Sequence, residues 1–566
     1  MPERIPADGD QPVFIAISKA AVVAQHFKSP IVAIIPDPDN WNDFGRGYFA
    51  KLHIFEGSSE LFAAHIRIMF EGFNRSEKAL TQLIEEFGEI IHIQEVSTPF
   101  VSLLPEEDMY GQMIDLLGFD QGVSALRKLH DAVVLRLEGV EKALIDLTYG
   151  EEFSIGVLRH SGAYSALRRG ARHFTPHPRS AVEDSAQKLE FVTQLLNSEN
   201  EIEVGFDFTA KPVFRDRIGV LVGQNGTGKT QFLKSMVDGL INIYREDEPV
   251  AIPRFSQPLN VHRVLVFSSV PTDPFPRRIG AWEGIDYDYF PLNTSRTDGS
   301  ETLLDALVAL RFESNDIGFK DGEERDRMDI LFEVLTRLGL KRLCLPLRNR
   351  QEDDDLPGVI EIEGNSYLPI SRKFNEQNTL AAYQQIDWKG TPAVVNEQMQ
   401  RRELSSGEVA MLRFSAQSIA AIETGSLLLL DEPETHLHPK YISDLIEVLY
   451  YLLEATKSIA IIATHSAYIV REASREKVKV LSLKDGILSF DTPRMQTFGA
   501  SIDTISQFAF GDTNEQHHFQ KVLIDWAQSV APEIGLNGVI KEFGEHLNSE
   551  SLSLIARSLS QPAKND

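Results

Sequence analysis

The sequence predicts an α/β fold in which a parallel sheet ends in a phosphate-binding loop and carries helical insertions. Three observations lead to this prediction. An apolar run at 218–222 precedes a glycine-rich loop, an amphipathic run follows that loop, and a second apolar run at 426–430 ends in two acidic residues. Apolar strands that feed glycine-rich loops and then helices are typical of the units that build parallel sheets.

The composition indicates a soluble globular protein of several domains. Its 566 residues suffice for about three to four domains. The net charge of −27 argues against a surface that coats nucleic acid non-specifically. The single cysteine, Cys344, allows no intrachain disulfide, and we expect it to be a small buried hydrophobe. Because neither a signal core nor a membrane-spanning run is present, we expect a cytoplasmic protein with no membrane contact.

Residues 223–230 have the spacing G-x-x-x-x-G-K-T of a P-loop. Glycines let backbone N–H groups close around phosphates, and the following helix adds its N-terminal dipole. Lys229 would place a positive charge at the β- and γ-phosphates, and the Thr230 hydroxyl would ligate Mg²⁺. The predicted nucleotide contacts of this segment are Gly223, Gln224, Asn225, Gly226, Thr227, Gly228, Lys229, Thr230 and Gln231.

Acidic and imidazole side chains follow two further predicted strands. Asp431 and Glu432 end the strand at 426–430, and His465 follows the strand at 458–463. A buried parallel strand would bring both acids to the sheet edge beside the P-loop. Asp431 would hold Mg²⁺, and Glu432 would act as the general base that deprotonates the attacking water. From the same edge, His465 could reach the γ-phosphate or that water.

A further anion site is predicted at 404–408, where a helix begins near Gly407. Beside a P-loop it would be redundant in a monomer, but it becomes useful if it faces the γ-phosphate of a nucleotide held by another subunit. The simpler alternative is an ordinary helix N-cap. The predicted contacts to the second subunit's nucleotide are Ser405, Ser406, Gly407 and Glu408.

Taken in chain order, four motifs resemble those of ABC-type ATPases. Residues 223–230 resemble Walker A, residues 404–408 the signature motif, residues 427–433 Walker B, and His465 the switch histidine. The resemblance implies an ABC-type P-loop ATPase head with helical insertions, which uses ATP and Mg²⁺ and forms a homodimer or higher oligomer through its heads. Residues 434–439, with the sequence E-T-H-L-H-P, resemble the D-loop of the RecF, SMC and OLD branch. Heads of that branch act in DNA repair or in anti-phage defence.

Within this branch, residues 264–276 are similar to a segment of the PtuA-like ATPases of Septu and retron defence systems. This resemblance implies a partner HNH nuclease, with a reverse transcriptase and its RNA–DNA hybrid product added in retrons. The segment lies where ABC transporters carry their Q-loop but has no glutamine. Its one ionisable residue, Asp273, is not assigned that role. The alternatives are a RecF-type repair ATPase that binds DNA directly and an ATP-binding scaffold with little turnover.

Composition and periodicity divide the chain into six segments. Helices are expected at 58–73, 75–87 and 121–149, where apolar residues recur every three to four positions. The segments are N-terminal strands of the head at 1–55, a helical insertion with a basic cluster at 56–200, the P-loop lobe at 201–300, a helical lobe at 301–400, the part carrying the other motifs at 401–510, and C-terminal helices that could dock a partner at 511–566.

The basic cluster lies between Arg159 and Arg179, a stretch with five arginines and no acidic residue. In so acidic a chain it is a candidate contact for phosphate or nucleic acid. The alternative is that these arginines pair with acidic residues of the same protein or touch the bound nucleotide.

Overall fold

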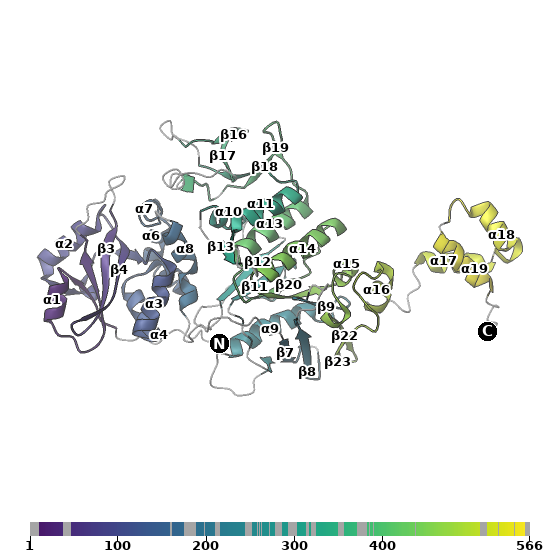
Figure 1. Cartoon of the computed structure of the whole chain (residues 1–566), viewed down its shortest axis with the longest axis horizontal. Helices are drawn as coiled ribbons and strands as arrows, with labels where there is room; N and C mark the ends of the chain where they lie inside the picture. The colour runs from purple at the N-terminus through teal and green to yellow at the C-terminus, as the bar shows by residue number, and fades with distance from the viewer. Residues whose placement is uncertain are drawn as a thin grey trace.

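The computed structural model describes an N-terminal unit (11–174), a head (188–509) and a C-terminal unit (518–560), coloured from purple to yellow in Figure 1. Within the described residues, every helix is too short or too polar to span a bilayer. The described residues are 11–37, 47–158, 161–174, 188–196, 198–209, 216–243, 252–256, 259, 261, 263–270, 272–277, 286–292, 303–312, 316–318, 324–348, 356–370, 382–383, 385–388, 390–435, 437–509, 518–529, 531–547 and 549–560.

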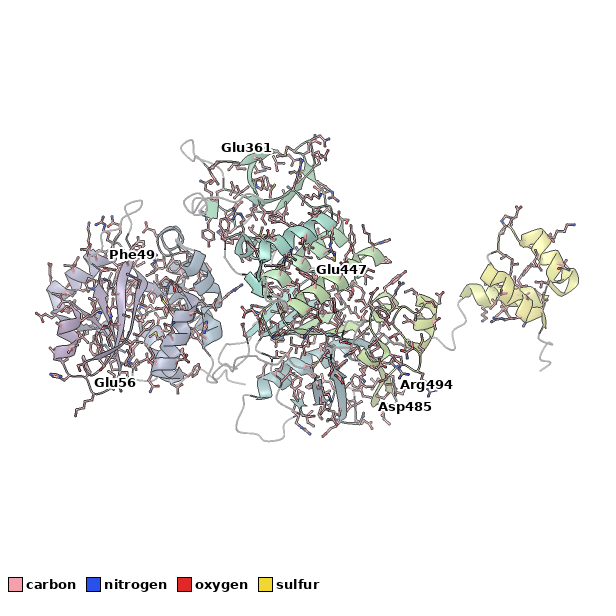
Figure 2. The ribbon with its side chains drawn as sticks, viewed as in Figure 1. Phe49, Glu56, Glu361, Glu447, Asp485 and Arg494 are labelled. Carbon is pink, nitrogen blue, oxygen red and sulfur yellow. The ribbon has the colours of Figure 1, made fainter. Side chains whose placement is uncertain are left out.

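The N-terminal unit contains a six-stranded sheet of its own, in the order β5-β1-β2-β3-β4-β6. Strands β1 and β2 are parallel, and the other neighbours are antiparallel. Phe49 and Glu56 mark the two ends of β3 in Figure 2. The strands are β1 (Val13–Ala16), β2 (Ile31–Pro36), β3 (Phe49–Glu56), β4 (Ser59–Phe70), β5 (Ile90–His92) and β6 (Phe100–Leu103).

This sheet corrects two predictions. The strands within 1–55 do not belong to the head, because β3 continues through a turn at Gly57 into β4 and both are strands of a separate sheet. Residues 58–73 are therefore mostly the strand β4 and not a helix. Pairing along the whole length of β3 outweighs the local helical spacing of that stretch.

Helices cover this sheet, and one predicted helix is divided into three. The stretch 121–149 breaks at His130, which has φ +48°, and at Gly139, which caps a helix with φ +67°. The predicted helix at 75–87 is confirmed as α2. The helices are α1 (Lys19–Ala24), α2 (Ser76–Phe87), α3 (Glu107–Leu117), α4 (Phe119–Lys128), α5 (Ala132–Glu138), α6 (Lys142–Tyr149), α7 (Glu151–Gly156) and α8 (Ser161–Arg169).

Asp131 is the buried N-cap of α5, and it gives the N-terminal unit a testable pH dependence. Its carboxyl accepts hydrogen bonds from Val133 N (2.9 Å) and from the Tyr110 hydroxyl (2.9 Å). Burial raises the pKa of Asp131 from 3.8 to about 7. Because the folded chain keeps the proton that the unfolded chain releases, stability is lost as the pH rises from about 4 to 7.

We therefore expect Asp131→Asn, which can still cap the helix, to remove this part of the pH dependence. Calorimetric melting temperatures of both proteins at pH 5 and pH 8 test this expectation. The wild type should lose more stability than the variant between the two pH values. Equal losses would show that Asp131 does not take up a proton on folding.

The head is built on a seven-stranded sheet in the order β12-β11-β20-β21-β9-β22-β23. All neighbours are parallel except the hairpin β22–β23. The P-loop follows the carboxyl end of β9, Asp431 is the last residue of β20, and Glu432 follows it. The strands are β9 (Ile218–Val222), β11 (Arg263–Ser268), β12 (Asp286–Pro291), β20 (Ser426–Asp431), β21 (Ile459–Thr464), β22 (Val478–Lys484) and β23 (Ile487–Asp491).

Alternate residues of these strands enter two different cores. Leu427 and Leu429 pack in a core with α9 (Lys229–Ile243) and a small antiparallel sheet. Leu428 and Leu430 pack in the core that includes α10 (Leu303–Phe312), α11 (Arg327–Arg337), α13 (Ser406–Ala421) and α14 (Pro439–Ala455). The small sheet has the order β10-β7-β8, with β7 (Lys188–Thr193), β8 (Ile202–Asp207) and β10 (Arg254–Phe255). Because its strands come from within 188–255, it takes the place of the head strands expected at 1–55.

The segment 301–400, expected to be helical, also contains a five-stranded sheet in the order β16-β17-β15-β18-β19. Cys344 is buried in this sheet, as expected of a small hydrophobe. The remaining strands are β13 (Asp316–Gly318), β14 (Glu324–Asp326), β15 (Leu343–Pro346), β16 (Ile360–Ile362), β17 (Asn365–Pro369), β18 (Ala393–Val395) and β19 (Arg401–Arg402).

The C-terminal unit is helical, as expected of 511–566. Ala527, Val539 and Ile555 form a small core of their own among its three helices. The other α-helices of the described residues are α15 (Ala467–Val470), α16 (Ile502–Ala509), α17 (His518–Ser529), α18 (Ala531–Phe543) and α19 (Ser549–Ser560).

Candidate nucleotide site

The P-loop joins β9 to α9 in a path that only glycine can follow at two positions. A Cβ on Gly223 would lie 2.5 Å from the backbone oxygen of Leu481, and Gly228 has φ +99°. The ammonium of Lys229 turns back to the loop and donates to Gly223 O (2.9 Å) and Gln224 O (3.1 Å). Burial lowers the pKa of Lys229, and the nearby carboxylates oppose that shift. The loop therefore carries a buried cation at a helix N-terminus, where an anion is favoured.

Thr230 and Asp431 are brought together although they are far apart in sequence. The Thr230 hydroxyl lies 2.9 and 3.1 Å from the two carboxyl oxygens of Asp431. Asp431 is fully buried, which raises its pKa to about 7, while the hydrogen bond from Thr230 opposes this effect. A hydroxyl and a carboxylate are hard oxygen ligands of the kind that Mg²⁺ prefers. The two residues predicted to hold the metal are thus adjacent and fit it chemically.

Glu432 adopts a backbone conformation that is rare for residues other than glycine, with φ +49°. Its N–H donates to Ala463 O of the neighbouring strand β21 at 2.9 Å, which helps to hold this conformation. The side chain is partly exposed, and its Oε1 lies 3.5 Å from His465 Nδ1. The two predicted catalytic side chains therefore lie next to each other, at the sheet edge that also carries Lys229. Backbone strain of this kind is concentrated at functional sites.

Glu434 is a site residue that the sequence analysis did not single out. Its buried Oε1 accepts hydrogen bonds from the Thr464 hydroxyl (2.5 Å) and from His465 N (3.0 Å). Burial raises its pKa, and the hydrogen bond from Thr464 opposes the shift. Glu434 thereby fixes the start of the loop that carries His465. Its place two residues after Glu432 could have drawn attention to it, but its partners come 30 residues later.

The start of α13 is a complete helix cap. The Ser405 hydroxyl accepts from Glu408 N (3.3 Å), and the Glu408 carboxyl accepts from Ser405 N (2.9 Å). Burial alone would raise the pKa of Glu408, but hydrogen bonds from Ser405 and the charge of Arg402 lower it below its ordinary value. Glu408, predicted to contact a nucleotide, thus has a structural role within its own chain. Gly407 is buried, whereas Ser405 and Ser406 are exposed and could meet another subunit.

Asp273, the ionisable residue of the loop after β11, also has a structural role. Its carboxyl accepts from the Tyr289 hydroxyl (2.5 Å), from Phe275 N (3.1 Å) and from Arg277 (3.1 Å). These bonds tie the loop to β12 and engage the Asp273 carboxyl within its own chain.

Arg169 is the member of the basic cluster whose contacts the structure describes most fully. Its side chain is 9% exposed, and its guanidinium lies 3.8 Å from the Glu423 carboxylate and donates to Ala420 O at 3.0 Å. Arg327 of α11 donates to Ile422 O at 2.8 Å from another direction. Both charges complement the dipole at the C-terminal end of α13.

For Arg169, then, the geometry favours pairing within the protein over contact with nucleic acid. It also joins the N-terminal unit to the helix that begins at Ser406. The side chains of Arg159, Arg168, Arg172 and Arg179 lie outside the described residues.

Comparison with known proteins supports this picture of the head. Residues 218–471 match a family of AAA domains described as "putative AbiEii toxin, Type IV TA system". Protein ea59 of Escherichia phage lambda is 23% identical over 536 residues, which cover 91% of this chain and 93% of that protein.

Two solved structures share limited similarity. A metal-chelate type ABC transporter is 13% identical, with 57% of this chain and 88% of that chain covered and a TM-score of 0.27. UvrA2 of Deinococcus radiodurans is 16% identical, with 59% and 39% covered and a TM-score of 0.27. The sheet order and the family match define the fold of the head. Residues 218–471 have the fold of a P-loop ATPase head.

Proposed function

We propose that this chain is an ABC-type ATPase that dimerises around ATP and hydrolyses it to regulate a partner nuclease in bacterial anti-phage defence. The observation that carries the ATPase part is the contact between Thr230 and Asp431 at one sheet edge, beside Lys229 and Glu432. In this proposal Lys229 neutralises the β- and γ-phosphates, while Thr230 and Asp431 hold Mg²⁺. Glu432 deprotonates the attacking water, and His465 senses the γ-phosphate.

Dimerisation is supported by the exposed serines at the start of α13. Ser405 and Ser406 lie at the N-terminus of a capped helix of 16 residues, which favours an anion. Placed against the P-loop of a second subunit, they would complete a site that neither subunit forms alone. This arrangement would make ATP binding and dimerisation a single event.

The defence role is supported more indirectly. The family that matches 218–471 is described by its toxin and toxin–antitoxin association, and the relative with matching length comes from a phage. Both fit a protein that acts in conflict between phage and host. The partner nuclease remains the part of the proposal that rests on the similarity of 264–276 to PtuA-like proteins. Genes for an HNH nuclease and a reverse transcriptase beside this one would support it. Pull-down of the nuclease by a variant that lacks residues 511–566 tests whether this segment docks that partner.

A mixing experiment tests the shared site. We expect Lys229→Ala, which disables the P-loop, and Ser406→Arg, which blocks the start of α13, each to lose ATPase activity alone. Mixed in equal amounts, the two variants should regain up to about a quarter of the wild-type rate, because half of the dimers then contain one intact composite site.

Ser406→Arg should still bind ATP, which shows that its fold and its P-loop are intact. A mixture that stays as inactive as its components would argue against a site built from two subunits. Full activity of Ser406→Arg alone would exclude α13 from the site.

A further inference from the structure

Arg67 is a buried cation of the N-terminal unit, and two of its guanidinium nitrogens lack a partner. It lies on β4 and is 5% exposed. Among the residues that the structure describes, none accepts a hydrogen bond from its Nε or Nη1 and none forms an ion pair with it. Burial lowers the pKa of this guanidinium to about 10. A buried charge without a counter-charge is unfavourable, so the position favours an added anion.

The ring of Phe49 holds the guanidinium in place. Phe49, labelled in Figure 2, pairs with Arg67 across β3 and β4. The guanidinium carbon lies 3.8 Å from the centre of the Phe49 ring. Such stacking covers one face of the planar group, while its N–H groups donate from the edges. The cation is therefore oriented before a ligand arrives, which reduces the entropic cost of binding.

Lys51 and His65 form the next pair of residues on the same face of the sheet. They oppose each other in register, two residues from Phe49 and Arg67, and alternate residues of a strand share a face. Their side chains are 42% and 62% exposed, so solvent reaches the sheet beside Arg67. Diagonal neighbours on paired strands lie about 7 Å apart, which allows one anion to contact both Arg67 and Lys51.

The acidic side chains near this face already have cationic partners. Asp37 pairs with Lys51 at 3.2 Å, and Glu60 pairs with Lys19 at 2.8 Å. Each of these carboxylates is thus matched by one lysine. Within the part of the face that the structure describes, the charge of Arg67 is in excess.

We propose that this face of the N-terminal unit binds a phosphate group, with Arg67 as its main contact and Lys51 and His65 beside it. The Nε and Nη1 atoms lie on different edges of the guanidinium, and Lys51 adds a donor from another side. A carboxylate has two oxygens, which one edge of the guanidinium satisfies. A phosphate has more oxygens and can meet donors from several directions. The ligand is therefore inorganic phosphate or a small phosphate monoester.

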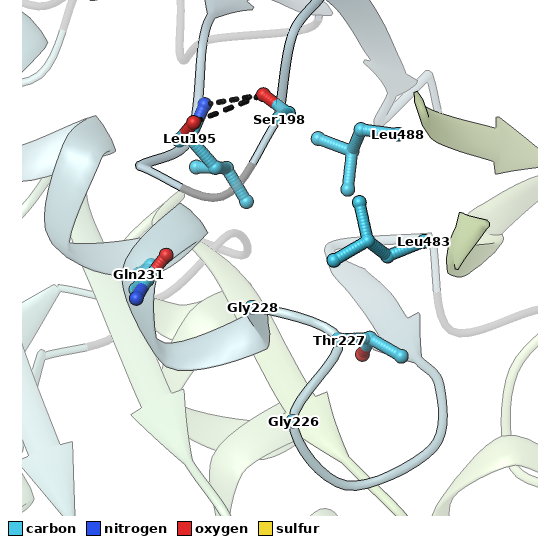
Figure 3. Close-up of a pocket in the computed structure, with 8 residues that line it drawn as sticks. All are labelled: Leu195, Ser198, Gly226, Thr227, Gly228, Gln231, Leu483 and Leu488. Atoms are coloured by element: carbon cyan, nitrogen blue, oxygen red, sulfur yellow. Dashed lines mark hydrogen bonds between the residues drawn. The ribbon is translucent and has the colours of Figure 1, made fainter. Parts of the chain in front are cut away.

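This phosphate site is separate from the P-loop. Gly226, Thr227 and Gly228 of the P-loop, labelled in Figure 3, belong to a glycine-rich turn in which backbone N–H groups can surround an anion. At Arg67 the donors are side chains on a sheet. Because the P-loop could also take up phosphate, the parent protein for the test is the full chain with Lys229→Ala. ATP is not used, so the result does not depend on the proposed ATPase function.

Calorimetric titration of this parent with inorganic phosphate and with ribose 5-phosphate tests the proposal. At least one of the two ligands should bind, and adding Arg67→Met should raise its Kd at least about tenfold. Tighter binding of ribose 5-phosphate would identify a monoester as the ligand, and tighter binding of inorganic phosphate would identify the free ion. Lys78→Met is the matched control, because Lys78 is exposed on α2, which packs on the opposite face of the sheet.

Melting temperatures without phosphate give an independent measurement. Arg67→Met should melt at least about 2 °C above the parent, because an apolar side chain of similar length replaces an unpaired buried charge. Arg67→Lys, which keeps the charge but lacks the planar fork, should bind with a Kd between those of the parent and of Arg67→Met. A Kd that Arg67→Met leaves unchanged would overturn the proposal, as would a parent that binds neither ligand. A lower melting temperature of Arg67→Met, or its failure to fold, would assign Arg67 a purely structural role and would also overturn it.

Discussion

Glu432→Gln is expected to lower ATP turnover at least about a hundredfold while ATP binding persists. The amide keeps the size of the side chain but cannot take the proton of the attacking water. Glu432 is held beside His465 by a strained backbone that pairs with β21, and it lies close to the buried Lys229. Removing its charge should not weaken the attraction for phosphate, because one fewer carboxylate then faces the nucleotide. ATP should consequently accumulate unhydrolysed and hold the dimer together.

Phosphate release measures ATP turnover, and light scattering after size-exclusion chromatography measures whether ATP holds the dimer together. Glu447→Gln is the matched control, because Glu447 is an exposed glutamate on α14 that pairs only at the surface with Arg337. It should leave both turnover and the oligomeric state unchanged. Normal turnover in Glu432→Gln would mean that another group serves as the base. Loss of ATP binding in that variant would assign Glu432 to the binding of nucleotide or metal instead.

The sequence was sufficient to predict that these side chains lie together, because they follow the ends of parallel strands. Val222 and Asp431 end β9 and β20, and parallel strands of one sheet share a carboxyl edge. That rule brings Thr230 to Asp431 without any knowledge of the intervening 200 residues. The helix at Ser406 was predictable for a similar reason, because its cap is made by neighbours in sequence.

Features that depend on partners distant in sequence were not predictable. The stretch 59–70 has helical spacing in the sequence, but in the fold it is a strand because β3 pairs with it along its whole length. Glu434 gains its role from Thr464, and the loop after β7 meets the hairpin β22–β23 through hydrogen bonds between Asn200 and Leu488. Neither meeting leaves a periodic or compositional pattern, because each depends on a few contacts across the sheet.

The role of single residues also depended on such contacts. Arg169 stands in a run of arginines that suggests a nucleic-acid surface, yet it is buried against the end of α13. Glu408 stands in a motif that suggests nucleotide contact, yet it caps its own helix. In both cases the residue type correctly predicted the charge of the environment. Only the fold shows which groups each side chain contacts.

Lys229→Ala is expected to weaken ATP binding at least about a hundredfold, which is the largest effect on affinity anticipated for this chain. The ammonium of Lys229 is the buried positive charge that offsets Asp431, Glu432 and Glu434, all of which act on its pKa. Without it, a triphosphate would approach three carboxyl groups with only backbone N–H groups to attract it. Because the interior screens charge poorly, this repulsion is larger than the same change would cause at the surface.

Calorimetric titration with ATP and Mg²⁺ measures the loss, and Lys234→Ala on the same helix is the control. Lys234 is partly exposed and pairs with Asp238 at 2.5 Å, so its removal changes the charge of the chain equally but leaves the site alone. If both variants weakened ATP binding equally, the loss would come from a long-range effect of net charge. A selective loss in Lys229→Ala would show that the buried ammonium itself binds the phosphates, because only that variant removes a charge from the inner side of the P-loop.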